Sequence, residues 1–157
     1  MTWHLRSASL TDLDAFTTME AEVYGDEAWS RELMQAELEN THGYYLAAVD
    51  EDDTVVGYAG LLAPLGTGQG DIQTITVAPA ARRHGLGRTL MLQLLNEARR
   101  RGAEELFLEV RYDNEPAQTL YRDLGFRDIG LRKNYYGHGV DAITMKLDVP
   151  PAKAGVA

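Results

Sequence analysis

The stretch from residue 71 to residue 101 constrains the fold of this 157-residue chain more than any other. Residues 71–77 alternate between apolar and polar side chains, as a half-buried strand does, and Pro79 stops the pattern. Over 87–101, apolar residues recur at helical spacing with polar residues between them. The turn between them, 82–88, reads Arg-Arg-His-Gly-Leu-Gly-Arg. The sequence therefore predicts a strand, a basic glycine turn and a helix in direct succession.

Such a junction is suited to binding an anion. The N–H groups of a helix's first turn point outward at the positive end of the macrodipole, and glycines let a phosphate approach the backbone. Arg82, Arg83 and Arg88 add positive charge. Two other phosphate motifs fit poorly, because a P-loop requires Lys-Ser/Thr after its second glycine and a dinucleotide fingerprint requires a third glycine. In the alternative interpretation the glycines only turn the chain and the arginines are solvated.

The remaining patterns predict a mixed fold that contains both hairpins and crossovers. We expect strands over 2–7, 44–49, 54–65, 106–110, 126–136 and 142–147, and helices from Ser9 or Thr11 to Val23, from Ser30 to Glu39 and over 115–124. This order predicts an α/β fold of the mixed α+β kind, and neither a doubly wound sheet nor a barrel. The length fits a single domain, which we assign to 1–149. We predict disorder for 150–157, which hold two prolines and then mostly small residues.

Composition narrows the classes of function. The net charge of -9 argues against a nucleic-acid partner, because phosphate binding needs a basic footprint. No apolar run approaches the roughly 18 residues of a membrane span, and the N-terminus lacks the features of a signal peptide. We therefore expect a cytoplasmic protein that binds no membrane. The lack of cysteine excludes disulfides and a cysteine nucleophile, and the four histidines are too scattered to predict a metal site.

The charges are unevenly distributed along the chain. Residues 1–81 hold 14 acidic residues and only two basic ones, whereas residues 82–157 hold 10 acidic and 13 basic residues. One interpretation is that the basic half faces an anionic cofactor while the acidic half attracts a cationic substrate. Ordinary solubility explains the same asymmetry, so charge alone does not choose between them.

The basic turn resembles a known motif. Arg82, Gly85 and Gly87 match the Q/R-x-x-G-x-G/A coenzyme A motif of the GNAT superfamily of N-acetyltransferases. The resemblance implies acetyl-CoA as cosubstrate and a mixed, mostly antiparallel sheet, with a central pair of parallel strands that splay apart and four flanking helices. The cofactor contacts that it implies are Ile75, Thr76, Val77, Arg83, His84, Gly85, Leu86, Gly87 and Arg88.

Residues 106–126 hold candidates for acid–base chemistry. Acetyl transfer to an amine needs a base, because an α-amino group with a pKa of about 7.7 to 8.0 is mostly protonated at neutral pH. Glu109 lies on an otherwise apolar strand, and cover on both faces of that strand would raise its pKa into a range suited to a base. Tyr121, on the next helix, could protonate the departing thiolate. From the residues alone, Glu109 could instead be a solvated partner of Arg111, and Tyr121 a core residue.

The same region resembles one branch of the superfamily, the bacterial ribosomal-protein alanine N-acetyltransferases (RimI type). The resemblance implies Glu109 as general base, Tyr121 as general acid and Asn114 as a cofactor contact. Residues 28–30, Ala-Trp-Ser, match the Pro-Trp-Ser of that branch except at the alanine, which leaves the shape of this substrate loop open. The peptide contacts that it implies are Trp29, Tyr135 and Tyr136. The two tyrosines could instead be a strand pair that packs on the sheet.

The sequence therefore predicts an N-acetyltransferase that transfers acetyl from acetyl-CoA directly to the N-terminal α-amine of a protein, with the alanine of a basic ribosomal protein as the expected acceptor. A second hypothesis keeps this chemistry but has a small amine, a lysine side chain, a polyamine or an antibiotic as the acceptor. A third is a non-catalytic module that binds coenzyme A. The presence of Glu109, Asn114 and Tyr121 together argues against the third.

Overall fold

The computed structural model describes residues 2–151, so the predicted disorder of 150–157 falls, from residue 152 onward, outside the described residues. Seven strands form one sheet: β1 (Trp3–Ser7), β2 (Gly43–Asp50), β3 (Val55–Leu62), β4 (Gln69–Val77), β5 (Glu105–Arg111), β6 (Arg127–Arg132) and β7 (Ala142–Asp148). The α-helices of this part of the chain are α1 (Leu13–Tyr24), α2 (Arg31–Glu39), α3 (Leu86–Arg100) and α4 (Glu115–Asp123). Short 3-10 turns are η1 (Leu10–Asp12), η2 (Gly25–Glu27) and η3 (Pro79–Ala81). Within residues 2–151, no helix is both long enough and apolar enough to cross a membrane.

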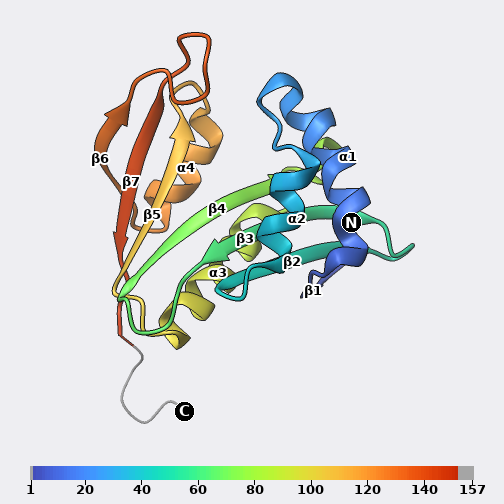
Figure 1. Cartoon of the computed structure of the whole chain (residues 1–157), viewed down its shortest axis with the longest axis horizontal. Coiled ribbons are helices and arrows are strands. Elements are labelled where there is room, and N and C mark those ends of the chain that lie inside the picture. Colours follow the sequence, from blue (N-terminus) through green and yellow to red (C-terminus); the bar gives the residue numbers. More distant parts are fainter. Residues whose placement is uncertain (1, 152–157) are drawn as a thin grey trace.

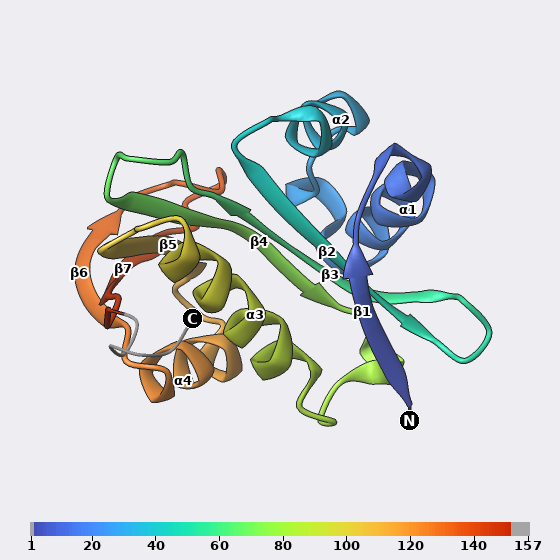
Figure 2. The ribbon, with the colours of Figure 1, turned by 90° about the horizontal axis from the view of Figure 1, so that it is seen from below.

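The strands lie in the order β1-β2-β3-β4-β5-β7-β6. All neighbours are antiparallel except β4 and β5, which are parallel. Helices α1 and α2 cover one face of the sheet, and α3 and α4 cover the other (Figure 1, Figure 2). The predicted fold class, a mostly antiparallel mixed sheet with one parallel pair and four helices, is confirmed.

The parallel pair opens soon after it forms. β4 and β5 pair at only three positions, of which the last joins Asp71 to Phe107. On the other side of β4, the register with β3 shifts after Gly60 and leaves Gln73 as an extra residue. Such a β-bulge bends its strand and increases the local twist. Because pairing with β5 ends just before Gln73, the bulge accounts for the gap between the C-terminal halves of β4 and β5 (Figure 1).

Each face of the sheet has its own core. The larger cluster joins apolar residues of α3, such as Leu90 and Leu94, to the inward residues of β5, such as Leu108. The smaller cluster lies under α1 and α2, where Phe16 stacks on Tyr58 with 4.4 Å between ring centres. The sheet is therefore fixed from both sides, and the gap between β4 and β5 is held open within a rigid frame.

The last hairpin differs from the prediction. We expected a strand over 126–136, but β6 ends at Arg132. Asn134 has a φ of 56°, in the left-handed region that asparagine tolerates better than most residues, and this conformation turns the chain out of the strand. Tyr135 and Tyr136 therefore lie in the connection to β7, where their rings meet edge to face at 5.0 Å. Their interpretation as a strand pair that packs on the sheet was wrong. The strand expected over 54–65 also ends early, at Leu62.

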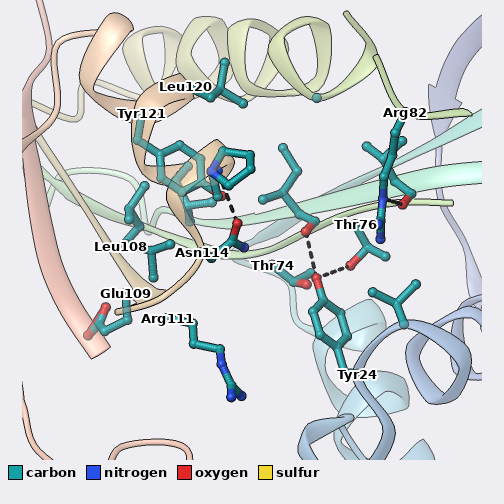
Figure 3. A pocket seen from close by; sticks show the side chains of 18 of the residues that line it. Tyr24, Thr74, Thr76, Arg82, Leu108, Glu109, Arg111, Asn114, Leu120 and Tyr121 are labelled. Carbon is teal, nitrogen blue, oxygen red and sulfur yellow. Dashed lines mark hydrogen bonds between the residues drawn. The ribbon is translucent and has the colours of Figure 1, made fainter. Parts of the chain in front are cut away.

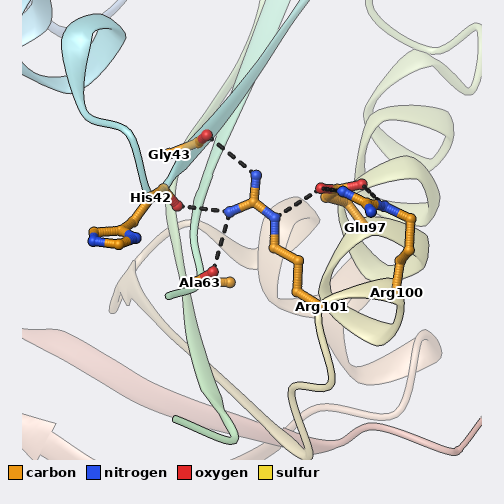
Figure 4. Close-up of polar contacts among 6 residues, drawn as sticks. All are labelled: His42, Gly43, Ala63, Glu97, Arg100 and Arg101. Atoms are coloured by element: carbon orange, nitrogen blue, oxygen red, sulfur yellow. Dashed lines mark hydrogen bonds and ion pairs between the residues drawn. The ribbon is translucent and has the colours of Figure 1, made fainter. Parts of the chain in front are cut away.

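Arg101, directly after α3, joins this helix to the start of β2 and the end of β3 (Figure 4). Its guanidinium donates to the carbonyl oxygens of His42 at 2.7 Å, Ala63 at 3.1 Å and Gly43 at 3.3 Å. Its Nε donates to the Glu97 carboxylate at 2.7 Å. The side chain of Arg101 is only 13% exposed. If it were removed, little water could reach its acceptors to form hydrogen bonds in its place.

Arg101→Met is expected to lower the free energy of unfolding by about 3 kcal/mol, because it leaves several partly buried acceptors without a donor. Urea denaturation followed by circular dichroism measures this loss. Arg100→Met is the matched control, since Arg100 pairs with the same Glu97 but its side chain is 70% exposed. Exposed ion pairs contribute about 1 kcal/mol or less. Equal losses in the two variants would contradict the anchoring role of Arg101.

Candidate active site

A cavity of about 1010 Å³ runs through the gap between β4 and β5 (Figure 3). Its walls come from these two strands, the start of α3, helix α4, the end of α1 and the segment that follows α1. The predicted site residues that line it are Trp29, Ile75, Thr76, Val77, Arg83, Gly85, Leu86, Gly87, Arg88, Glu109, Asn114, Tyr121 and Tyr136. His84 is exposed and does not line this cavity, and Tyr135 lines a smaller pocket beside it. The fold thus brings together nearly all the residues that the sequence singled out.

The basic turn lines the cavity at the start of α3. Gly85 is the N-cap residue of α3, in the left-handed conformation with a φ of 79°, and no side chain caps the helix there. A Cβ built at Gly85 would meet nothing within 4 Å, so the space beside the backbone is open. Arg83 and Arg88 line the same region, while the side chain of Leu86 is buried in the larger core. Open space, a bare helix N-terminus and two guanidinium groups suit an anion such as a phosphate.

The backbone of β4 forms one wall beyond the bulge. β5 pairs with β4 no further than Asp71, so the edge of β4 that faces the gap is open to an extended ligand. The carbonyl oxygen of Ile75 accepts a hydrogen bond from the Tyr24 hydroxyl at 3.0 Å, and that of Val77 accepts one from Arg82 Nε at 3.1 Å (Figure 3). Two side chains therefore already fix this wall in place.

Glu109 lies on the face of β5 opposite the larger core. Cover on both faces of this strand was the condition for a raised pKa of Glu109. Burial instead alternates along β5, and Leu108 and Val110 point into the core while Glu109 does not. Its side chain is nevertheless only 19% exposed, and Oε1 is 3.4 Å from Nε of Arg132. Burial raises the pKa of Glu109, Arg132 opposes that shift, and Asp71 adds to it. A partly buried carboxylate with a raised pKa can accept a proton from a nearby amine.

The alternative pairing of Glu109 with Arg111 was wrong. Arg111 instead forms ion pairs with Glu27, which follows α1, and with Asp113 at 2.7 Å. These contacts hold the end of β5 against the segment between α1 and α2. Glu109 is thereby left with a single cation partner within the described residues, Arg132.

Tyr121 reaches the cavity from α4, on the other side of β5 from Glu109 (Figure 3). Its residue is 6% exposed, and its ring packs edge to face on Phe126 at 6.1 Å. Within residues 2–151 its hydroxyl has no hydrogen-bond partner, yet it is not among the fully buried unpaired atoms, so it faces the cavity. Burial raises the pKa of Tyr121 and keeps the phenol protonated at neutral pH. Tyr121 is therefore both a core residue and a possible proton donor.

Asn114 begins α4 at the edge of the cavity. Its Oδ1 accepts a hydrogen bond from the Ala117 N–H at 3.2 Å and so caps the helix. Further along α4, the side chain of Gln118 donates to the carbonyl oxygens of Arg111 at 3.0 Å and Tyr112 at 2.9 Å. These bonds fix α4 against the end of β5 and hold Asn114 beside the cavity.

A second pocket, of about 280 Å³, adjoins the first. The two pockets share Trp29, Ile72, Gln73, Glu109 and Tyr136, and the smaller one is also lined by Asp71 and Tyr135. Its walls are therefore mostly aromatic and acidic, which suits a cationic group on an apolar stem. Glu109 stands where the two pockets meet.

Several residues of the site were not predicted. Tyr24, Gln73, Asp71 and Glu27 line one or both pockets, and Arg132 pairs with Glu109. Tyr24 had only a weak signal in the sequence, its place directly before the glycine that ends α1. The other four residues reach the site only because the fold brings distant parts of the chain together, and no local sequence pattern predicts this.

Comparison with known proteins gives the family. A profile described as "Acetyltransferase (GNAT) family" matches residues 10–126. The N-alpha-acetyltransferase RimI of Mycobacterium tuberculosis is 39% identical over 146 residues, which are 89% of this chain and 90% of that protein. The uncharacterized protein ML0378 of Mycobacterium leprae is 40% identical over 141 residues, 87% of this chain, but the match spans only 38% of that longer protein.

The crystal structure of the ribosomal-protein-S18-alanine N-acetyltransferase from Escherichia coli superposes with a TM-score of 0.85 and 28% identity, over 99% of each chain. These similarities agree with the coenzyme A motif and with the splayed sheet. The chain belongs to the acetyltransferase (GNAT) family.

Proposed function

We propose that this N-acetyltransferase transfers acetyl from acetyl-CoA to the N-terminal α-amine of a protein, and that its acceptor is the N-terminal alanine of a basic ribosomal protein. The observation that carries the proposal is the place of Glu109 at the junction of the two pockets, with the Tyr121 hydroxyl on the opposite side of β5. The similarity to the E. coli enzyme, named for the alanine of ribosomal protein S18, supports the choice of acceptor. We also propose that the reaction takes place in the cytoplasm, where ribosomal proteins are made.

The residues of the larger cavity fit acetyl-CoA. The open backbone at Gly85 and the guanidinium groups of Arg83 and Arg88 would hold the pyrophosphate. The edge of β4 that β5 leaves unpaired would bind the amides of the pantetheine arm, as a strand partner does. The carbonyl oxygens of Ile75 and Val77 already accept from Tyr24 and Arg82, but each has a second lone pair for the arm. Asn114 has its amide NH₂ left over from capping α4 and would hold the arm from the other side. When bound, acetyl-CoA supplies the activated acetyl group as a thioester.

The protein residues would act on protons at the two ends of the reaction. Glu109 takes a proton from the acceptor ammonium, directly or through a water molecule, and leaves a nucleophilic amine. The amine nitrogen forms a bond to the acetyl carbon as the carbon–sulfur bond breaks. Backbone N–H groups of β4 beside the gap can stabilise the charge that develops on the acetyl oxygen. Tyr121 then gives its proton to the departing sulfur. The nitrogen, now bonded to the acetyl carbon, loses its second proton to water, and the tyrosinate regains a proton from the solvent.

The smaller pocket would receive the acceptor. Trp29, Tyr135 and Tyr136 would enclose the first residue of the peptide. Asp71 and Glu109 provide negative charge toward a cationic N-terminus.

Intact-mass profiling of protein N-termini from cells with and without this protein tests the proposed acceptor. We expect one or a few proteins with an N-terminal alanine, ribosomal proteins among them, to lose one acetyl mass when this protein is absent. Unchanged N-termini together with a loss of acetylated small amines would favour a small-molecule acceptor instead.

Two substitutions beside Glu109 are expected to move the pH dependence of kcat/KM in opposite directions. Activity rises with pH as Glu109 loses its proton. Arg132→Met removes a cation that lowers the pKa of Glu109, so the ascending limb moves to higher pH. Asp71→Asn removes an anion that raises this pKa, so the limb moves to lower pH. Lys133→Met, a change to the exposed cation next to Arg132, is the control and leaves the limb in place. Shifts of both variants in the same direction would contradict the assignment.

Gly85→Ala is expected to weaken the binding of acetyl-CoA by roughly tenfold. A non-glycine residue in the left-handed conformation costs about 1–2 kcal/mol, so the loop of the free variant adopts another conformation. Acetyl-CoA must then restore the left-handed conformation when it binds, and this cost lowers the affinity. Gly87→Ala is the matched control, because a Cβ there makes only ordinary contacts, at 3.6 Å from Leu120 and 3.9 Å from Val77. Isothermal titration of acetyl-CoA measures both variants. Equal affinity in the two would show that the shape of the loop at Gly85 does not matter.

A further inference from the structure

Glu20, on α1, is 2% exposed although it carries a carboxyl group. Its Oε1 accepts a hydrogen bond from the Tyr58 hydroxyl at 2.6 Å. Its Oε2 accepts one from the backbone N–H of Trp29 at 2.9 Å. No ion pair among residues 2–151 includes it. Burial of a polar group costs free energy unless it is hydrogen-bonded. The two hydrogen bonds offset this cost, and they are the interactions that Glu20 contributes at this position.

The bond to Trp29 holds a segment that has little structure of its own. Residues 25–30, here named the acceptor segment, consist of the short turn η2, the extended Ala28, Trp29 and the N-cap residue of α2. The segment has a second anchor at Glu27, which pairs with Arg111 two positions beyond Glu109 on β5. The acceptor segment is therefore fastened to α1 through one residue and to the catalytic strand through another.

Trp29 lines both pockets, so the place of its backbone decides the shape of the region where they meet. Glu20 also lines the larger cavity, but both of its oxygens already accept hydrogen bonds within the protein. Its arrangement suits a holding role better than a role as a second base.

We propose that Glu20 is a positioning residue for the acceptor: it fixes the Trp29 backbone and thereby sets the wall of the pocket in which the incoming amine approaches Glu109. This inference rests on the proposed function for its consequence in catalysis. The placement of Trp29 itself can be measured without any substrate. The positioning role of Glu20 and the proposed function can therefore be refuted independently.

The first test is kinetic. Glu20→Met should raise the KM for an alanine-initiated peptide by about tenfold or more, because small misplacements of an acceptor can cost as much as ~10²-fold. The dissociation constant of acetyl-CoA should stay unchanged. Glu20→Gln should restore the low KM, since an amide oxygen can accept from Trp29 and its NH₂ can donate to Tyr58. Glu22→Met, on the exposed face of the same helix, is the matched control. An unchanged peptide KM in Glu20→Met, or equal damage to peptide and acetyl-CoA binding, would overturn the proposal.

A second variant covers the case in which Glu20→Met does not fold. Glu20→Asp keeps the carboxyl group but withdraws it by one methylene, so it cannot reach both donors. It should also raise the peptide KM, and a normal KM in a folded Glu20→Asp protein would count against the proposal.

The second test follows Trp29 directly. The chain has two tryptophans, so Trp3→Phe leaves Trp29 as the only one. In this background, Glu20→Met and Glu20→Asp should shift the Trp29 emission to longer wavelength and lower its anisotropy, while Glu22→Met should leave both unchanged. Unaltered emission and anisotropy in the Glu20 variants would refute the positioning role. If the Trp29 signals change but no peptide is acetylated by the parent protein, the proposed function fails while the positioning contact stands.

Discussion

Glu109→Gln is expected to lower kcat/KM for an alanine-initiated peptide by about 10²–10⁴-fold at neutral pH, the range for the loss of a general base. Glutamine keeps the shape of the side chain on β5 but cannot take the ammonium proton. The deficit should narrow as the pH rises, because the amine then loses its proton without help. Initial rates of peptide acetylation across the pH range measure both effects.

Glu105→Gln is the matched control for this experiment. Glu105 lies on the same strand and the same face as Glu109, but it pairs with Lys146 and lines neither pocket. Glu105→Gln should keep normal activity, and both variants should bind acetyl-CoA with the natural affinity. If Glu109→Gln kept the natural kcat/KM and the same rise of activity with pH on the acidic side of the profile, Glu109 would not be the base.

Tyr121→Phe is expected to have the second largest effect, a fall in kcat of about 10²-fold. We expect the lower end of the range for acid catalysis, because a thiolate leaves more readily than an amine or alkoxide. The ring keeps its packing against Phe126, so the fold should not change. The peptide KM should change little, since the hydroxyl faces the larger cavity. Single-turnover measurements with bound acetyl-CoA report the chemical step directly.

The control here is Tyr112→Phe, which removes the hydroxyl of an exposed tyrosine that lines neither pocket. It should keep the natural kcat. A Tyr121→Phe enzyme with the natural single-turnover rate would require another proton donor, and Tyr136, which also lines the cavity, would then be the next residue to test.

Local patterns predicted much of the frame. The alternation in 71–77, the glycine turn and the helical spacing that follows led to β4, the turn at the start of α3 and α3 itself. The first two helices were expected to begin at Ser9 or Thr11 and at Ser30. Ser9 and Ser30 each accept a backbone hydrogen bond at the start of a helical segment. Short-range preferences suffice for such elements because the residues that decide them are neighbours in the sequence.

Long-range geometry was harder to predict. The bulge at Gln73 does not interrupt the alternation in a visible way, yet it opens the sheet. The left-handed Asn134 moves the two tyrosines out of β6, and a single asparagine gives no clear warning of this. The bond from Trp29 to Glu20 and the ion pair between Glu27 and Arg111 depend on folded neighbours rather than on spacing.

The central claim is tested most directly with one synthetic peptide that begins with alanine, continues with basic residues and includes a lysine. Incubated with the protein and acetyl-CoA, it should gain one acetyl group, which fragment masses place on the α-amine. The same peptide with a blocked α-amine and a free lysine should gain none. Acetylation of the lysine in both peptides would contradict the account. So would a protein that acetylates a small amine but neither peptide.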